Sequence, residues 1–113
     1  MAAGKYNILI QQGADYIQPI TIRDSITQVA TDLTGCTVRG QVRQRFEDTD
    51  ALASFVVNYD DLPNGKFTLT ISNTVTAALK FDTGVYDVEL VYPSGVVDRI
   101  LQGKVVLSQE VTK

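Results

Sequence analysis

The sequence contains no histidine and no tryptophan, and it has a single cysteine, Cys36, among its 113 residues. Without histidine the chain lacks the commonest general base, the Ser-His-Asp triad and the usual imidazole ligands of zinc. A lone cysteine cannot form an internal disulfide, and a free cysteine among apolar neighbours behaves as a small hydrophobic residue. Carboxylates are the remaining route to catalysis, and none are predicted to face each other across a groove, as a glycosidase requires. We therefore expect a protein that is not an enzyme and that binds no cofactor and no metal.

Long apolar runs are missing as well, because no stretch approaches the ~20 residues of a membrane span. The first twelve residues, MAAGKYNILIQQ, lack the pattern of a secretory signal. The formal net charge is −3, from 10 basic and 13 acidic residues. This balance gives no electrostatic reason to bind nucleic acid, and neither GxGxxG nor GxxxxGK[ST] occurs. We expect a protein that is made in a cytoplasm and has no nucleic-acid or membrane partner.

The dominant pattern that is present has a period of two residues. In CTVRGQVR, residues 36–43, small and apolar residues alternate with threonine, glutamine and arginine, and KFTLTI (66–71) and GVYDVELVY (84–92) alternate in the same way. Such alternation is typical of β-strands with one face in a core and one face in water. The sequence predicts about seven antiparallel strands, over residues 6–11, 15–23, 36–44, 52–59, 66–71, 84–92 and 96–107.

Turn residues separate these strands, with Pro-Asn-Gly at 63–65 and Pro-Ser-Gly at 93–95. Pro19 lies inside the second strand and cannot donate to a ladder, so we expect that strand to be an edge strand or to be bulged. Gly103 interrupts the last strand, where we expect a β-bulge.

Residues 72–81 break the alternation, because they begin with capping residues and continue with apolar residues at helical spacing. We expect one short helical crossing between sheets near residues 73–80. Many short strands with one such crossing predict an all-β fold, an immunoglobulin-like β-sandwich, with a barrel as the alternative. The sandwich forms a single domain over residues 1–113 with short polar termini.

Five segments carry a resemblance to a known family, and together they span nearly the whole chain. They lie within residues 12–24, 32–43, 65–72, 76–90 and 99–113, and include DLTGCTVRG, GKFTLTIS, GVYDVEL and LQGKVVLSQEVTK. In this order they resemble small β-sandwich virion structural proteins of tailed bacteriophages, and the chain is similar to the N-terminal domain of upper baseplate proteins.

The resemblance implies a non-enzymatic structural component of the virion, in the tail, baseplate or neck, made in the host bacterial cytoplasm. Its implied partners are other copies of itself and neighbouring virion proteins. Upper baseplate proteins carry a long extension after this domain, whereas the sequence ends at Lys113, so we expect an accessory or adaptor module. The alternatives are a capsid-surface decoration protein and a module that recognises carbohydrate or protein on the host surface.

Charged residues supply the candidates for a subunit interface. An arginine-lined strand could meet a carboxylate-lined strand of a neighbour through bidentate pairs. A cluster of acidic residues at 45–50, RFEDTD, is more typical of the solvated tip of a long hairpin than of a metal site. The alternative to an interface role, for every one of these positions, is an ordinary solvent-exposed surface. The interface candidates are Arg39, Arg43, Arg45, Glu47, Asp48, Asp87, Glu89, Glu110 and Lys113.

Two further expectations concern the chain ends and one tyrosine. Residues 1–5 and 108–113 are polar, so we expect them to be disordered in the isolated chain. One of them, together with an exposed edge strand, would carry part of the subunit contact. Tyr86 lies near the start of a late strand and could be a corner tyrosine whose hydroxyl bonds to the backbone.

Overall fold

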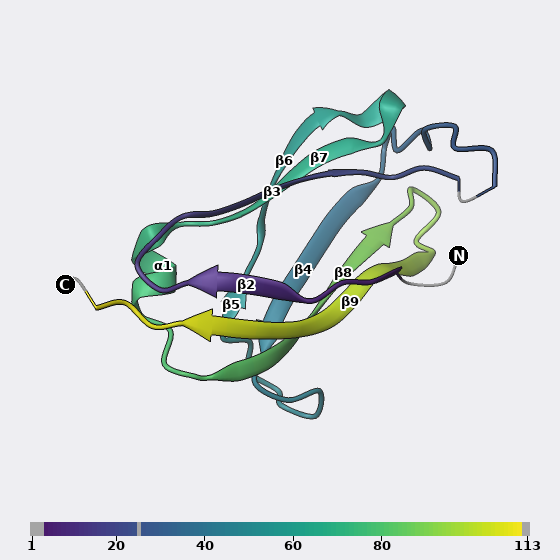
Figure 1. Cartoon of the computed structure of the whole chain (residues 1–113). Coiled ribbons are helices and arrows are strands. Elements are labelled where there is room, and N and C mark those ends of the chain that lie inside the picture. Colours follow the sequence, from purple (N-terminus) through teal and green to yellow (C-terminus); the bar gives the residue numbers. More distant parts are fainter. Residues whose placement is uncertain (1–3, 25, 112–113) are drawn as a thin grey trace.

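The computed structural model describes residues 4–24 and 26–111, which form two packed β-sheets (Figure 1). The two-sheet arrangement agrees with the predicted sandwich and not with the alternative barrel. The elements are β1 (Gly4–Lys5), β2 (Ile8–Gln11), β3 (Tyr16–Thr21), β4 (Thr37–Arg43), β5 (Ala53–Ser54), β6 (Val56–Asp61), the 3-10 helix η1 (Leu62–Asn64), β7 (Lys66–Ile71), α1 (Asn73–Ala77), β8 (Thr83–Val91) and β9 (Val97–Ser108).

The larger sheet, here called sheet A, has the strand order β1-β9-β8-β4-β5, and β2 also pairs with β9. The smaller sheet, sheet B, has the order β3-β7-β6. Along β7 and β8 every second side chain is buried, as the alternation predicted. The buried side chains of both sheets, among them Phe67, Leu69, Val88 and Leu90, form one core between them. Burying each such side chain contributes about 1.5–3 kcal/mol, so this core is the main source of stability.

Phe55 ties the two sheets together at the point where the chain passes from sheet A to sheet B. The single strand expected over 52–59 is therefore wrong, because β5 pairs with β4 and β6 pairs with β7. The ring of Phe55 packs against Tyr16 of sheet B and Tyr86 of sheet A, with centroid distances of 6.0 and 6.1 Å. A Cβ on Gly40 would lie only 2.9 Å from the Phe55 side chain, so the glycine makes room for the ring.

The predicted helical crossing is confirmed, because α1 connects β7 of sheet B to β8 of sheet A (Figure 1). The helix begins after Ser72, whose side chain accepts a hydrogen bond from the amide of Val75. Thr76 is fully buried, and its hydroxyl donates to the carbonyl of Ala14 at 2.8 Å and accepts from the amide of Gly13 at 3.1 Å. These bonds hold the helix against the turn between β2 and β3.

The N-terminal strands run parallel to β9, so the expectation that all strands are antiparallel is wrong. Ile8 to Gln11 pair with Val105 to Ser108 in the same direction, and Gly4 and Lys5 pair with Leu101 and Gln102. Alternation along one segment reports which side chains point inward, but it does not report the direction of a neighbouring strand.

The expectation for Pro19 is confirmed, because β3 is an edge strand of sheet B. The expectation of a bulge at Gly103 is wrong, because the pairing of β8 with β9 shifts between Val88 and Glu89. The unpaired extra residue of β9 at this point is Ile100. The backbone of Tyr6 approaches Gly103 closely instead, so that a Cβ there would lie 2.2 Å from the Tyr6 carbonyl oxygen. Glycine at 103 thus lets the N-terminal strand dock.

The hydroxyl of Tyr86 donates to the carbonyl of Tyr6. The expectation that it bonds to the backbone is confirmed, although its partner lies in the N-terminal segment and not at a corner nearby in sequence. The ring itself is 3% exposed.

The chain ends are more ordered than expected where the structure describes them. Gly4 and Lys5 form β1, and the Ser108 carbonyl accepts a hydrogen bond of 2.9 Å from the amide of Gln12. The amide of Glu110 in turn donates to the Gln12 side chain at 2.9 Å. Residues 1–3 and 112–113 lie outside the described residues.

We predict that Gly103→Ala lowers the free energy of unfolding by about 1–3 kcal/mol, because the added methyl would force Tyr6 away from β9. Urea unfolding measures this change. Gly4→Ala is the matched control, since its added Cβ would find its nearest neighbour at an ordinary 3.5 Å. Equal losses in the two variants would contradict the close approach at Gly103.

Tyr86→Phe removes the hydroxyl that bonds to the Tyr6 carbonyl. We expect a loss of about 0.5–1.5 kcal/mol in unfolding free energy and faster amide exchange over residues 4–11. The control is Tyr6→Phe, because the Tyr6 side chain is 54% exposed. Unchanged exchange over this segment in Tyr86→Phe would show that the bond does not hold the N-terminal strand.

Candidate interaction face

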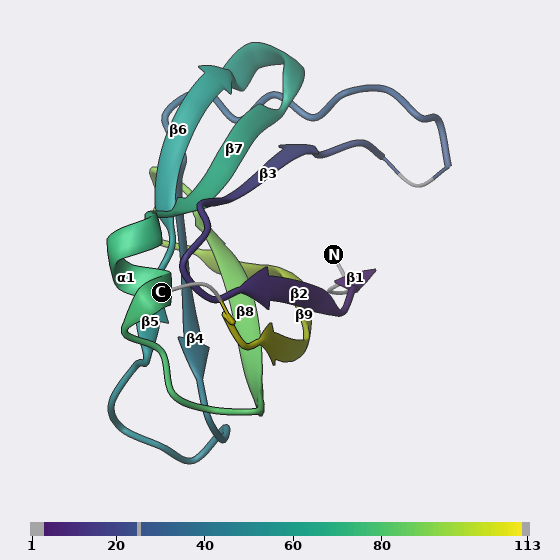
Figure 2. The ribbon, with the colours of Figure 1, turned by 60° about the vertical axis from the view of Figure 1, so that its left-hand side comes forward.

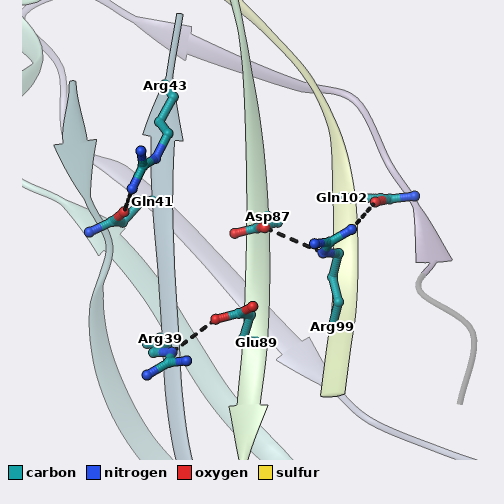
Figure 3. A network of polar contacts seen from close by, with 7 residues as sticks. All are labelled: Arg39, Gln41, Arg43, Asp87, Glu89, Arg99 and Gln102. Carbon is teal, nitrogen blue, oxygen red and sulfur yellow. Dashed lines mark hydrogen bonds and ion pairs between the residues drawn. The ribbon is translucent and has the colours of Figure 1, made fainter. Parts of the chain in front are cut away.

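The outward side chains of β4, β8 and β9 form a polar network on the surface of sheet A (Figure 3). We call this surface the polar face, and it consists of Arg39, Gln41, Arg43, Asp87, Glu89, Arg99 and Gln102. The strand register places Arg39 opposite Glu89 and Glu89 opposite Arg99. Residues far apart in the sequence therefore meet in adjacent rows of one sheet.

Two ion pairs cross between the strands of the polar face. Nε of Arg39 lies 2.9 Å from Oε1 of Glu89, and Nε of Arg99 lies 3.4 Å from Oδ2 of Asp87. The two arginine side chains are 59% and 52% exposed. Exposed pairs of this kind contribute about 0–1 kcal/mol to stability. The network therefore contributes little to the fold and remains accessible to a partner.

Arg43 is oriented by oxygens of its own chain. One of its terminal nitrogens donates to Oε1 of Gln41 at 2.8 Å, and the other donates to the carbonyl of Asp48. Asp48 also accepts a hydrogen bond from the amide of Arg45. These contacts hold the loop between β4 and β5, residues 44–52, beside the polar face, and they confirm that RFEDTD is a hairpin tip.

The electrostatics of the polar face centre on Asp87. Burial raises the pKa of the Asp87 carboxyl above its usual value, and the adjacent Glu89 carboxylate raises it further. The guanidinium groups of Arg99, Arg43 and Arg39 act in the opposite direction. The charged form of Asp87 is thus partly compensated within the chain.

The polar face carries more positive than negative charge. Its three arginines face two carboxylates, and Lys104 and Lys5 extend it along β9 and β1, where they lie opposite Val85 and Gln102. The whole chain has a formal charge of −3, so the residues outside this face carry a net negative charge. Charge is therefore unevenly distributed over the chain.

Shallow hollows interrupt this surface. One of about 520 Å³ lies beside β4 and is lined by Phe55, Val57 and Tyr59 together with polar-face residues. A second, of about 380 Å³, lies on the polar face and is bordered by Phe46 of the 44–52 loop and by Val85. Phe46 is 75% exposed. Exposed aromatic residues beside arginines are the composition in which binding energy concentrates.

The structure brings together four of the predicted interface residues, namely Arg39, Arg43, Asp87 and Glu89. We expected the carboxylates to meet a neighbour's arginines, but in the structure they meet arginines of the same chain. Three more, Arg45, Glu47 and Asp48, lie in the adjacent 44–52 loop. Glu110 follows β9 beside Gln12, away from the polar face, and Lys113 lies outside the described residues.

Arg99, Gln102 and Lys104 were not predicted as members of this surface. The extra residue Ile100 shifts the alternation of β9, so that Arg99 and Gln102 both face outward although they are three positions apart. Phe46 was also missed, and its only signal was an aromatic residue inside a polar loop.

Other chemistry is limited in the described part of the chain. Cys36 is 8% exposed, and burial raises the pKa of its thiol, so it behaves as a core residue. No group of three or more cysteine, aspartate or glutamate side chains within residues 4–24 and 26–111 could hold a metal ion. No helix formed by these residues combines the length and the hydropathy needed to cross a membrane.

No protein-family model matches the sequence, and no curated protein matches it either. Among solved structures, the chain is similar to one in the crystal structure of ICOS in complex with ICOS-L and an anti ICOS-L VNAR domain. The TM-score is 0.51 at 12% identity, over 96% of this chain and 56% of that one, so this chain spans about half the length of its match.

Two further structures have TM-scores of 0.49 and 0.47, at 12% and 13% identity. They come from photo-crosslinking work on multimeric cell-adhesive interactions of VGSC beta subunits and from parallel homodimers of the extracellular domain of the voltage-gated sodium channel beta4 subunit. The first alignment covers 99% of this chain and 98% of the other, and the second covers 98% of both. Identities this low show the fold alone. The chain is an all-β, immunoglobulin-like sandwich.

We predict that the pKa of Asp87 lies above 3.8 and responds to its neighbours in opposite directions. Glu89→Gln should lower this pKa by removing a like charge, and Arg99→Gln should raise it by removing a cation. Carboxyl carbon chemical shifts followed by NMR between pH 2 and 7 measure it.

A raised pKa in the folded state also fixes the sign of the pH dependence of stability. Above pH 3.8 the folded chain then binds more protons than the unfolded chain, so the free energy of unfolding falls as the pH rises. The stability that Asp87 contributes is therefore fully present below the unfolded pKa and is lost as the pH rises through the folded pKa. In Asp87→Asn this component of the pH dependence should disappear. A pKa below 3.8 in the parent chain would contradict the dominance of burial.

Proposed function

We propose that the chain is a non-enzymatic interaction module that acts through protein–protein contacts. The observation that carries this proposal is the polar face, an exposed sheet surface with surplus positive charge on an acidic chain. The face has hollows bordered by an exposed aromatic side chain, and it has no buried catalytic group. Arginine and aromatic residues are enriched in surfaces that recognise other proteins.

The resemblance to small virion proteins of tailed bacteriophages supplies the setting for this proposal. In that setting the chain is a structural component of the tail, baseplate or neck, and its partners are other copies of itself and neighbouring virion proteins. Many symmetric copies allow individually weak contacts to hold a particle together. A capsid-surface decoration role would use the same face and differ only in the layer that holds it.

The charge distribution suggests how the face selects partners. Surplus arginine and lysine on the face attract acidic surfaces, and the remainder of the same chain is acidic. Complementary charge mainly sets orientation and the rate of encounter, while apolar contacts at its margin supply affinity. The two ion pairs within the chain partly offset the repulsion among the arginines of the face.

Incorporation into particles tests the proposed function. For this test, an affinity-tagged copy of the chain is produced in bacteria in which the tailed phage that encodes it assembles its particles. We expect it to sediment with intact particles and to have density in their reconstruction. Arg39→Glu should reduce incorporation at least about tenfold, because it turns an exposed cation of the face into an anion.

The matched control is Lys66→Glu, which makes the same charge reversal at an exposed position of β7 in sheet B. This variant should incorporate normally. Arg39→Gln separates loss of the cation from the added repulsion, and urea unfolding verifies that each variant folds. Intact particles from producing cells that contain none of the chain would contradict a virion role. Binding of the monomer to glycan arrays would favour host recognition instead.

A further inference from the structure

A small hairpin projects from the end of the sandwich between β3 and β4 (Figure 2). Its base is a bridge between Arg23 and Ala30, and its tip carries Ile26 and Val29. These two apolar side chains are 89% and 64% exposed. An isoleucine that is almost fully exposed at the end of a projecting loop contributes nothing to the core of its own chain.

Hydrogen bonds within the hairpin hold this tip in place. Oδ1 of Asp24 accepts from the amides of Ile26 and Thr27, each at 2.9 Å, and the amide of Asp24 donates to the carbonyl of Val29 at 2.9 Å. The amides of Thr27 and Ile26 lower the pKa of Asp24, so the carboxylate is charged at neutral pH. The hairpin therefore presents an exposed isoleucine whose amide is bonded to a carboxylate.

An apolar pocket lies elsewhere, at the margin of the polar face. Its volume is about 330 Å³, and its walls include Phe46, Val85 and Gly103. Lys5 and Lys104 also line it, together with Asn7 and Gln102. The pocket thus combines apolar side chains with two cationic ones.

The tip and the pocket complement each other in two independent respects. A branched aliphatic side chain fits an apolar pocket walled by an aromatic ring and a valine, where both lose contact with water. The Asp24 carboxylate is opposite in charge to the ammonium groups of Lys5 and Lys104. Because both surfaces belong to the same chain, a second copy is the partner that offers both matches.

We infer that the Ile26 tip of one copy inserts into the Phe46 pocket of a second copy, so that the chain assembles head to tail. This inference rests on the proposed function and names the partner and the surfaces. The two surfaces are different, so the contact is heterologous: the first copy keeps a free pocket and the second keeps a free tip, and further copies can add at both ends. Such contacts close into rings or continue as filaments.

Sedimentation velocity of the purified full chain over a range of concentrations tests the inference. We expect the parent chain to form oligomers larger than dimers. Ile26→Asp removes the apolar side chain of the tip, and Phe46→Asp removes the aromatic wall of the pocket. Both residues are so exposed that the fold should tolerate the change. Each variant alone should self-associate at least about tenfold more weakly.

Mixing the two variants gives the sharpest outcome. The Ile26→Asp chain keeps its pocket and the Phe46→Asp chain keeps its tip, so a 1:1 mixture should form dimers and nothing larger. Ile17→Asp is the matched control, because Ile17 is 63% exposed on β3 of sheet B and should not matter. Lys104→Glu should weaken assembly, whereas Lys104→Arg should preserve it.

Three results would overturn the inference: a parent chain that stays monomeric, an Ile26→Asp variant that assembles like the parent, or a mixture that stays monomeric. None of them decides whether the chain enters particles, which the incorporation experiment tests separately. A chain that enters particles but never binds itself would show that its neighbours there are other proteins.

Discussion

The alternation of buried and outward side chains along β8 is the constraint on which the rest of the structure depends. Its buried residues, Tyr86, Val88 and Leu90, pack into the core, and its outward residues, Asp87 and Glu89, form the centre of the polar face. A register slip of one residue would place both carboxylates in the core and expose the apolar side chains. Core and candidate interaction face are therefore two sides of one pattern, and a change of register that disrupts the core also disrupts the face.

Because the chain passes from sheet A to sheet B at Phe55, the β4 edge of sheet A is only partly paired with a neighbouring strand. β5 pairs with only two residues of β4, and β6 then leaves for the other sheet. The amide of Val38 donates at 3.1 Å to the hydroxyl of Tyr59, which stands where a neighbouring strand would otherwise supply an acceptor. Because this edge amide is already bonded, strand addition has less to gain there. Side chains of the polar face are the better candidates for contact.

Charge and shape act together in the proposed mode of action. Arginine and lysine gather on one face of an acidic chain, while exposed apolar side chains stand at a loop tip and beside a pocket. Electrostatic attraction orients two molecules before they touch, and apolar burial at a small number of positions then holds them. A module of this kind needs no catalytic group, and its weak contacts become effective when many copies are arranged with symmetry.

The sequence by itself determined where most of the strands lie, that α1 crosses between sheets and which side chains of β4, β7 and β8 face the core, because these follow from local periodicity and capping. Only the tertiary structure decided that β2 runs parallel to β9, that the strand around Phe55 divides between two sheets and that Ile100 is the extra residue of β9. It also decided that Glu89 meets Arg39 within one chain. The physical reason is that alternation tells a side chain inward from outward, whereas the identity and direction of a neighbouring strand depend on contacts between residues far apart in sequence.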